Sequence, residues 1–280
     1  MIDFGRRVPR RWPAERNARR ALVLDCPELW PLGILPPPYQ RIPLGWAQML
    51  AEVRREPPSS VAIVHAVQGG APDPRVRELV EAAGLVPVVA VVPFDDAHAP
   101  HLPTLLGWGV AELADARFEA TAGAIAPRLQ AVHAAPFKRV LEPHLSRFVS
   151  MQALTLLRAA AGVAVDRGAA PGLALTFGAE GRTVAGWCAR EALPPPRRLI
   201  AWLRLLLALA LLDPPGRTVM DAARCAGYRD HSLRRAVRDF LGAGTRPRPG
   251  LFAVAAAAFN DELRQLRERA RDARPGVRPG

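Results

Sequence analysis

Two continuous apolar runs, Val61–Val64 and Val86–Val92, constrain the fold of this chain more than any other feature. Both are rich in valine, and neither alternates with polar residues, which is typical of strands whose two faces are both buried. Residues 73–84 lie between them and carry apolar residues at helical spacing. Strands of this kind alternating with helices indicate a parallel sheet with helices on both faces.

Further segments extend this alternation, so residues 1–135 are expected to form a small α/β domain. Residues 29–43, with five prolines, are expected to be a loop. Other apolar and periodic segments predict two more strands, at 21–25 and 110–114, and helices over 45–55, 100–107 and 118–134.

The second half shows only helical periodicity. Residues 137–141 are expected to be a linker, and 144–165 one long apolar-faced helix. The apolar run 199–212 has 14 residues, fewer than the roughly 20 that span a bilayer, so it predicts a buried helix. The sequence therefore predicts an all-helical domain over 136–250. Residues 251–280 are expected to hold an alanine run, a charged helix over 260–271 and a disordered tail from Arg274.

The two halves also differ in charge. Residues 1–135 contain 14 basic and 14 acidic residues, whereas residues 136–280 contain 24 and 12, so the second half carries the whole net charge of +12. A GC-rich genome explains why arginine outnumbers lysine, but not this asymmetry. A basic half joined to a neutral half suggests a module that binds a polyanion.

Several classes of site have no signature in the sequence. Cys26, Cys188 and Cys225 are scattered, which argues against a zinc site or a disulfide framework and fits a reducing cytoplasm. No apolar segment of signal-peptide type follows the N-terminal arginines. Since neither a nucleophile arrangement, a glycine-rich phosphate loop nor paired catalytic carboxylates stand out, we expect no enzyme activity, no metal and no cofactor.

The clearest functional signal is a pair of helices around Gly227. Thr218 begins a short helix with an acid three positions on, as in a capping box, and this helix ends at Gly227. In the next helix, Leu233, Val237 and Phe240 recur at core spacing, and the arginines between them must point elsewhere. An arginine-bearing helix after a glycine turn is how a helix-turn-helix presents its reading helix to DNA. An ordinary solvated amphipathic helix is the other interpretation.

A similar pair precedes it. A short helix over 172–176 is followed by Gly178 and a second helix with an early arginine, Arg182. The apolar helix that begins at Pro196 connects the two pairs, and proline is well tolerated at a helix start. Its stripe, which includes Trp202, is expected to be core.

This layout resembles the DNA-binding domain of the AraC family of bacterial transcription regulators over about residues 145–250. The motifs are G-Y…S-L-R-R-A-V…F-L-G in the second pair and F-G-A-E-G-R-T-V, then L-P-P-P-R-R-L-I-A-W-L-R-L-L, in the first pair and the connecting helix. The resemblance implies that each pair places a helix in one of two successive major grooves of double-stranded DNA.

The resemblance also implies which residues face DNA, chiefly Arg182 and Arg190 in the first pair and Arg229, Asp230, His231, Arg234, Arg235 and Arg238 in the second. Base reading would fall to His231, Arg234, Arg235 and Arg182. Arg197 and Arg198 are expected near a phosphate because cations oppose the dipole in the first turn of a helix unless an anion lies there. The chain departs from the family pattern in a shorter turn after Gly227, a stretched exit after Gly242, and Gly186 where a long polar side chain is common.

The first half resembles a response-regulator receiver that lacks the residues for phosphorylation. Receivers are phosphorylated on an aspartate at the end of a central strand, which here ends at His65. The first strand is followed by Asp25 alone, a weak Mg²⁺ site, and no lysine precedes Lys138. We therefore expect a degenerate receiver kept for contacts with a protein partner or a second copy.

The sequence as a whole predicts a cytoplasmic transcription regulator that binds DNA. One alternative is a protein-interaction adaptor whose helix-turn-helix domain does not bind DNA. Another is a small-molecule sensor or enzyme with a cleft near Asp25, His65 and Asp95, at the sheet edge where ligands enter open α/β folds.

Overall fold

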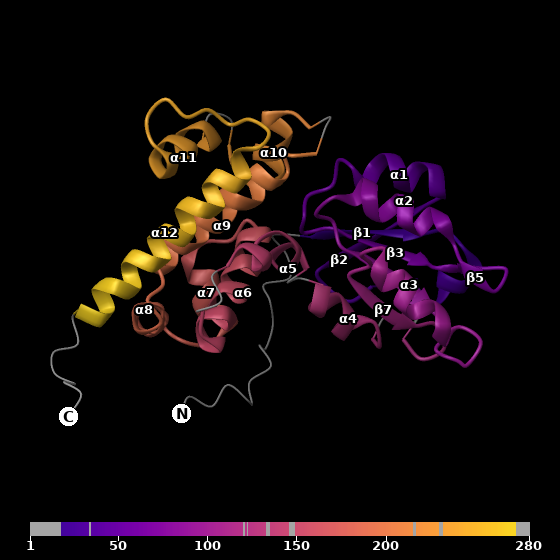
Figure 1. Cartoon of the computed structure of the whole chain (residues 1–280). Coiled ribbons are helices and arrows are strands. Elements are labelled where there is room, and N and C mark those ends of the chain that lie inside the picture. Colours follow the sequence, from indigo (N-terminus) through magenta and orange to yellow (C-terminus); the bar gives the residue numbers. More distant parts are fainter. Residues whose placement is uncertain are drawn as a thin grey trace. The chain divides into compact units, whose positions relative to one another are not determined.

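Five parallel strands form one sheet in the order β2-β1-β3-β6-β7 (Figure 1). This order, in which the chain winds first to one edge and then to the other, is that of flavodoxin-like doubly wound sheets. The strands are β1 (Arg19–Leu24), β2 (Tyr39–Leu44), β3 (Val61–His65), β6 (Val88–Val92) and β7 (Glu112–Asp115).

The computed structural model describes residues 18–33, 35–119, 121, 123–132, 135–145, 149–214, 217–229 and 232–272. The chain divides between Pro136 and Phe137 into two compact units. The expected class, a parallel α/β sheet followed by a helical half, is confirmed at this level.

One strand was predicted as loop. The prediction for 29–43 is wrong at its end, because β2 pairs with β1 in parallel from Arg19↔Tyr39 to Leu24↔Leu44. Its proline, Pro43, is tolerated because β2 is an edge strand, where a backbone N–H can be missing without breaking a central ladder. Earlier in the same segment the chain forms a 3₁₀ helix, η1 (Pro27–Leu32).

The other elements of this unit follow the predicted alternation with one correction. Residues 118–134 form a much shorter helix than predicted, α4, because Pro127 fits only in the first turn of a helix. After β3 the chain makes a small hairpin of β4 (Val67–Gln68) and β5 (Ala71–Pro72). The helices are α1 (Trp46–Val53), α2 (Pro74–Ala83), η2 (Ala99–His101), α3 (Leu102–Gly107) and α4 (Ala126–Ala131).

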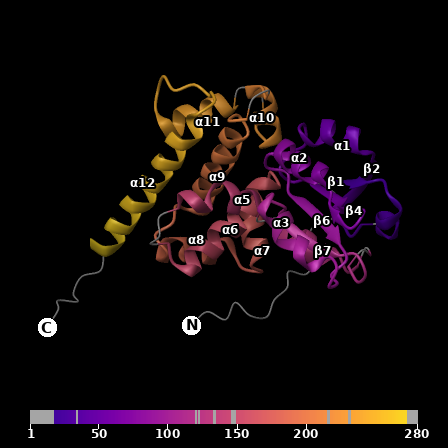
Figure 2. The same cartoon turned by 45° about the vertical axis from the view of Figure 1, so that its right-hand side comes forward.

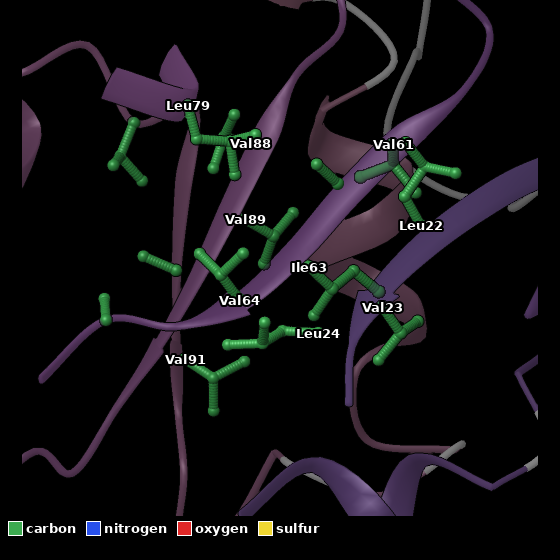
Figure 3. Close-up of a cluster of buried hydrophobic side chains, with 14 of the residues drawn as sticks. Leu22, Val23, Leu24, Val61, Ile63, Val64, Leu79, Val88, Val89 and Val91 are labelled. Carbon is green, nitrogen blue, oxygen red and sulfur yellow. The ribbon is translucent and has the colours of Figure 1, made fainter. Parts of the chain in front are cut away.

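The core of this unit is the sheet itself. All five residues of β6 are buried, and since successive strand residues point to opposite faces, both faces are covered. Figure 3 shows the aliphatic side chains of β1, β3 and β6 packed together with Leu79 of α2. This packing explains why the strands read as continuous apolar runs.

The second unit is helical, and two predicted boundaries change. The predicted linker 137–141 largely belongs to a helix, α5. The helix predicted over 144–165 begins only at Met151, because the Ser150 hydroxyl caps it by accepting a hydrogen bond from Ala153 N at 3.0 Å. The elements are α5 (Ala135–Val140), η4 (Glu142–His144), α6 (Met151–Val165), α7 (Ala170–Thr176), α8 (Gly181–Arg190), α9 (Pro196–Ala210), α10 (Val219–Cys225), α11 (Ser232–Leu241) and α12 (Leu251–Asp272).

The predicted apolar helix, α9, is the centre of this unit. Most of its side chains are buried, and α6, α7, α8, α10, α11 and α12 all pack against it. Arg204, which interrupts the apolar run, donates a hydrogen bond from Nη2 to the carbonyl of Gly168. Within the part of the chain that the structure describes, no helix has the length and apolar composition needed to cross a membrane.

The last helix, α12, is longer than predicted. It joins the alanine run to the charged segment in 22 continuous residues, because Leu251, Ala255, Phe259 and Leu263 form one buried stripe at helical spacing. The predicted disordered tail from Arg274 lies outside the described residues.

Candidate nucleic-acid interface

Two short helices end in the same way. After α7 and after α10 the chain passes through a glycine with positive φ, Gly178 at 58° and Gly227 at 76°. In each case the glycine N–H and the next N–H bond back to carbonyls of the helix, at 2.8–3.1 Å, which is a Schellman ending. The chain then begins a second helix, so the unit contains two helix pairs, α7–α8 and α10–α11.

The turn at Gly227 is tightly packed as well as left-handed. A Cβ on Gly227 would lie 2.6 Å from Cγ and 2.8 Å from Cβ of Arg167, at the start of the α6–α7 connection. A Cβ on Gly178 would meet no atom within 4 Å. Glycine is therefore required at Gly227 for two reasons and at Gly178 for one.

The second helix pair presents arginines to the surface. Leu233 and Val237 of α11 are buried, while Arg234, Arg235 and Arg238 are exposed. The Arg235 side chain is 79% exposed, with Asp239 Oδ2 3.6 Å from its Nε. One face of α11 thus fixes it to the unit, and the opposite face, which we call the α11 arginine face (Arg234, Arg235 and Arg238), points into solvent.

The connection before α11 holds the other predicted contacts of this pair. Arg229 is exposed, and its carbonyl accepts hydrogen bonds from the backbone N–H and the hydroxyl of Ser232, at 2.9 and 2.5 Å. Asp230 and His231, two of the residues predicted to face DNA, lie outside the described residues. The predictions for them remain untested.

The first helix pair presents fewer cations. Arg182 is 87% exposed and pairs with Glu180 at 2.7 Å, and Arg190 is exposed in the last turn of α8. Val184 and Cys188, four positions apart in α8, are both buried. Gly186 lies on the exposed side and brings no side chain to it. The surface of α8 can make charge contacts, but it has few groups for recognising bases.

The two arginines at the start of α9 have different environments. Arg197 is exposed. Arg198 donates to Glu262 of α12 from Nε at 2.6 Å and from Nη2 at 2.7 Å. This carboxylate, chiefly through its hydrogen bond, raises the pKa of Arg198. The anion at this end of α9 is thus a side chain of the same protein, which sequence reasoning missed because the partners are 64 positions apart.

Burial shifts the pKa of four ionisable groups in the two helix pairs and in α9. Tyr228 and Arg204 interact electrostatically, and burial raises the pKa of Tyr228 and lowers that of Arg204. Burial also raises the pKa of Cys225, and it raises the pKa of Cys188 to about 11. The raised pKa values keep both thiols neutral, and neutral thiols are weak nucleophiles.

The candidate residues at the sheet edge of the first unit lie at the carboxyl ends of neighbouring strands: Asp25 follows β1, His65 ends β3 and Asp95 comes after β6. Asp95 contacts His98 Nδ1 at 2.6 Å and Arg117 at 2.5 Å, and the hydrogen bond from His98 lowers the pKa of Asp95. Asp25 is exposed, and His65 is half-buried and acts electrostatically on Glu28 and Asp73. Among the described residues, no three His, Cys, Asp or Glu side chains are placed to hold a metal ion.

Comparison of the chain with protein families, curated proteins and solved structures gave no match in any of the three.

Proposed function

We propose that this protein is a transcription regulator that binds double-stranded DNA through its two helix pairs. The observation that carries the proposal is α11, a helix anchored by Leu233 and Val237 whose opposite face holds three exposed arginines. A helix held in this way after a left-handed glycine suits insertion into a major groove. The resemblance to the AraC family over residues 145–250 agrees with this function.

The order of the helices supports reading of two DNA segments. Figures 1 and 2 show α8 and α11 on opposite sides of α9, against which both pack. Because α9 is largely buried from Leu199 to Leu209, it can hold the two helices at a fixed distance. In this proposal each of them enters one of two successive major grooves.

The residues divide by role. Arg234 and Arg235 read bases with His231, and Arg182 contributes from the first pair, because arginine makes paired hydrogen bonds to guanine. Arg190, Arg197, Arg229 and Arg238 contact phosphates, which give affinity without sequence choice. Since Arg198 already has a carboxylate partner, we assign it to the support of α11 rather than to a phosphate.

The first unit is proposed to be a receiver-like domain used for protein contacts. Its strand order, β2-β1-β3-β6-β7, supports this, since receivers have the same doubly wound order. At the end of β3, where a receiver has its phosphorylated aspartate, stands His65. We expect this domain to contact a second copy of the chain or a protein partner, and we expect the protein to be in the cytoplasm.

Selection of bound fragments from random duplex DNA, at two salt concentrations, tests the proposal. We expect enrichment of a motif with two parts, about one helical turn apart. The variant R234A/R235A/R238A should lose the enrichment. The control R54A/R55A/R77A removes the same charge from exposed arginines of the first unit and should keep it. Absence of any enriched motif with the wild type would favour the adaptor.

A further inference from the structure

The carboxylate of Glu262 joins two helices. Its Oε1 and Oε2 accept the two hydrogen bonds from Arg198, and Oε2 also accepts one from Trp202 Nε1 at 2.7 Å. Its side chain is 19% exposed. This carboxylate on α12 therefore satisfies one charged and one neutral donor of α9, a geometry that fixes both side chains.

Both of these donors contact the same ring of α11. The Arg198 guanidinium lies 5.0 Å from the centre of the Phe240 ring, and the Trp202 ring lies 4.4 Å from it. A cation over an aromatic ring and a tilted pair of rings are both attractive. Phe240 follows Val237 in the last turn of α11, so this contact is a third anchor for the helix. We call Glu262, Arg198, Trp202 and Phe240 the Glu262 clamp.

The helix that carries Glu262 is itself fixed. Phe259, one turn before Glu262, is buried against Trp202 with ring centres 5.6 Å apart. Asn260 donates a hydrogen bond to the carbonyl of His144 at 2.5 Å, and the His144 ring lies edge-on to Phe252 at 5.2 Å. The clamp thus holds Phe240 to a helix that three other contacts hold in place.

We infer that Glu262 is a positioning residue for DNA binding: by holding Arg198 and Trp202 against Phe240, it sets the orientation of α11 and thereby of the α11 arginine face. This inference rests on the proposed function. A ten-residue helix such as α11 is marginal by itself, so its direction depends on its anchors. Glu262 strengthens DNA binding without touching DNA, although its negative charge alone would weaken it.

The sign of the effect separates this role from a competing one. If α12 instead blocked a phosphate site at Arg198, removing the Glu262 charge would release Arg198 and tighten binding. The variants are E262Q and its control E268Q, which removes the same charge from an exposed position of α12. Affinity for a selected duplex and the slope of log K against log salt are measured for both.

We expect E262Q to bind roughly 2- to 30-fold more weakly than wild type with an unchanged salt slope. We expect E268Q to bind as tightly as wild type or slightly more tightly. Equal behaviour of the two variants, or tighter binding by E262Q with a slope steeper by about one, would overturn the inference.

A second readout does not depend on DNA. Hydrogen exchange of the α11 amides should become faster in E262Q and stay unchanged in E268Q, and equal exchange would also overturn the inference. If the wild type bound no DNA, the proposed function would be refuted. The comparison of hydrogen exchange would still show whether Glu262 holds α11 in place. If E262Q did not fold, R198M/E262Q, which leaves no unpaired charge, would replace it. Its control is R264M/E268Q, and the same differences are expected.

Discussion

Substitution of Gly227 by alanine should destabilise the helical unit more than the same change at Gly178. Both glycines have positive φ, which costs an alanine about 1–2 kcal/mol, offset in part by the lower entropy of the unfolded chain. Only at Gly227 does the new Cβ overlap another residue, at 2.6 Å from Arg167 Cγ, and overpacking of this kind costs about 1–3 kcal/mol more. G178A should therefore cost about 1 kcal/mol and G227A about 2–4 kcal/mol.

The assay is urea unfolding of the full chain, together with hydrogen exchange of peptides from α10 and α11, which reports the opening of this region. Arg167 also has positive φ, at 58°, so R167G/G227A is compared with R167G rather than with the wild type. Because removing the Arg167 side chain removes the overlap, this comparison should recover most of the extra loss. Equal losses for G178A and G227A, or no recovery in the double variant, would refute the reasoning.

Three further results are expected. Ala192 follows α8 with φ 52°, a conformation that strains alanine but not glycine. A192G should therefore raise the free energy of unfolding by about 0.5–1 kcal/mol in urea titrations, and a lower free energy of unfolding would contradict this strain. The Asp73 carboxylate caps α2 by accepting from Arg75 N at 3.0 Å, so D73A should cost about 1 kcal/mol, and a thermal midpoint like that of wild type would contradict the cap. Burial alone would raise the pKa of Glu262, but the hydrogen bonds from Arg198 and Trp202 lower it by more than burial raises it. The pKa therefore lies below its usual 4.5. The ionised Glu262 carboxylate therefore stabilises the fold fully above about pH 4.5, and this stabilisation is lost as pH falls through the folded pKa. The unfolding midpoint should accordingly depend less on pH in E262Q than in the wild type, measured between pH 6 and roughly pH 3.

Much of the fold could be predicted because the burial of a helix or strand determines which of its positions are apolar. The strands β3 and β6 are buried on both faces, so their residues are apolar without interruption up to His65 at the end of β3. The connecting helix α9 was predicted from its apolar run, and it proved to be the helix against which the others pack. The edge strand β2 was missed because only its partner β1 requires it, and prolines at an edge look like a loop.

The candidate interface was only partly predictable. The exposed arginines of α11 follow from the spacing of Leu233, Val237 and Phe240, since residues between core positions must point outward. The carboxylate partner of Arg198 could not be predicted, because Glu262 lies 64 positions away and no local pattern records such a contact. The overlap that a Cβ on Gly227 would make with Arg167 is also a tertiary effect, whereas the end of the helix at Gly227 was predicted from the sequence.

The most direct test of the account is the salt dependence of binding to one selected duplex, measured between about 50 and 200 mM salt for the wild type and for R234A/R235A/R238A. If the α11 arginine face lies against DNA, the triple variant should bind much more weakly than the wild type. The slope of log K against log salt should fall by about 0.9, since Arg238 is the one arginine of this face assigned to a phosphate and each phosphate contact contributes about 0.9. A triple variant that keeps the wild-type slope and affinity would show that this face does not contact DNA.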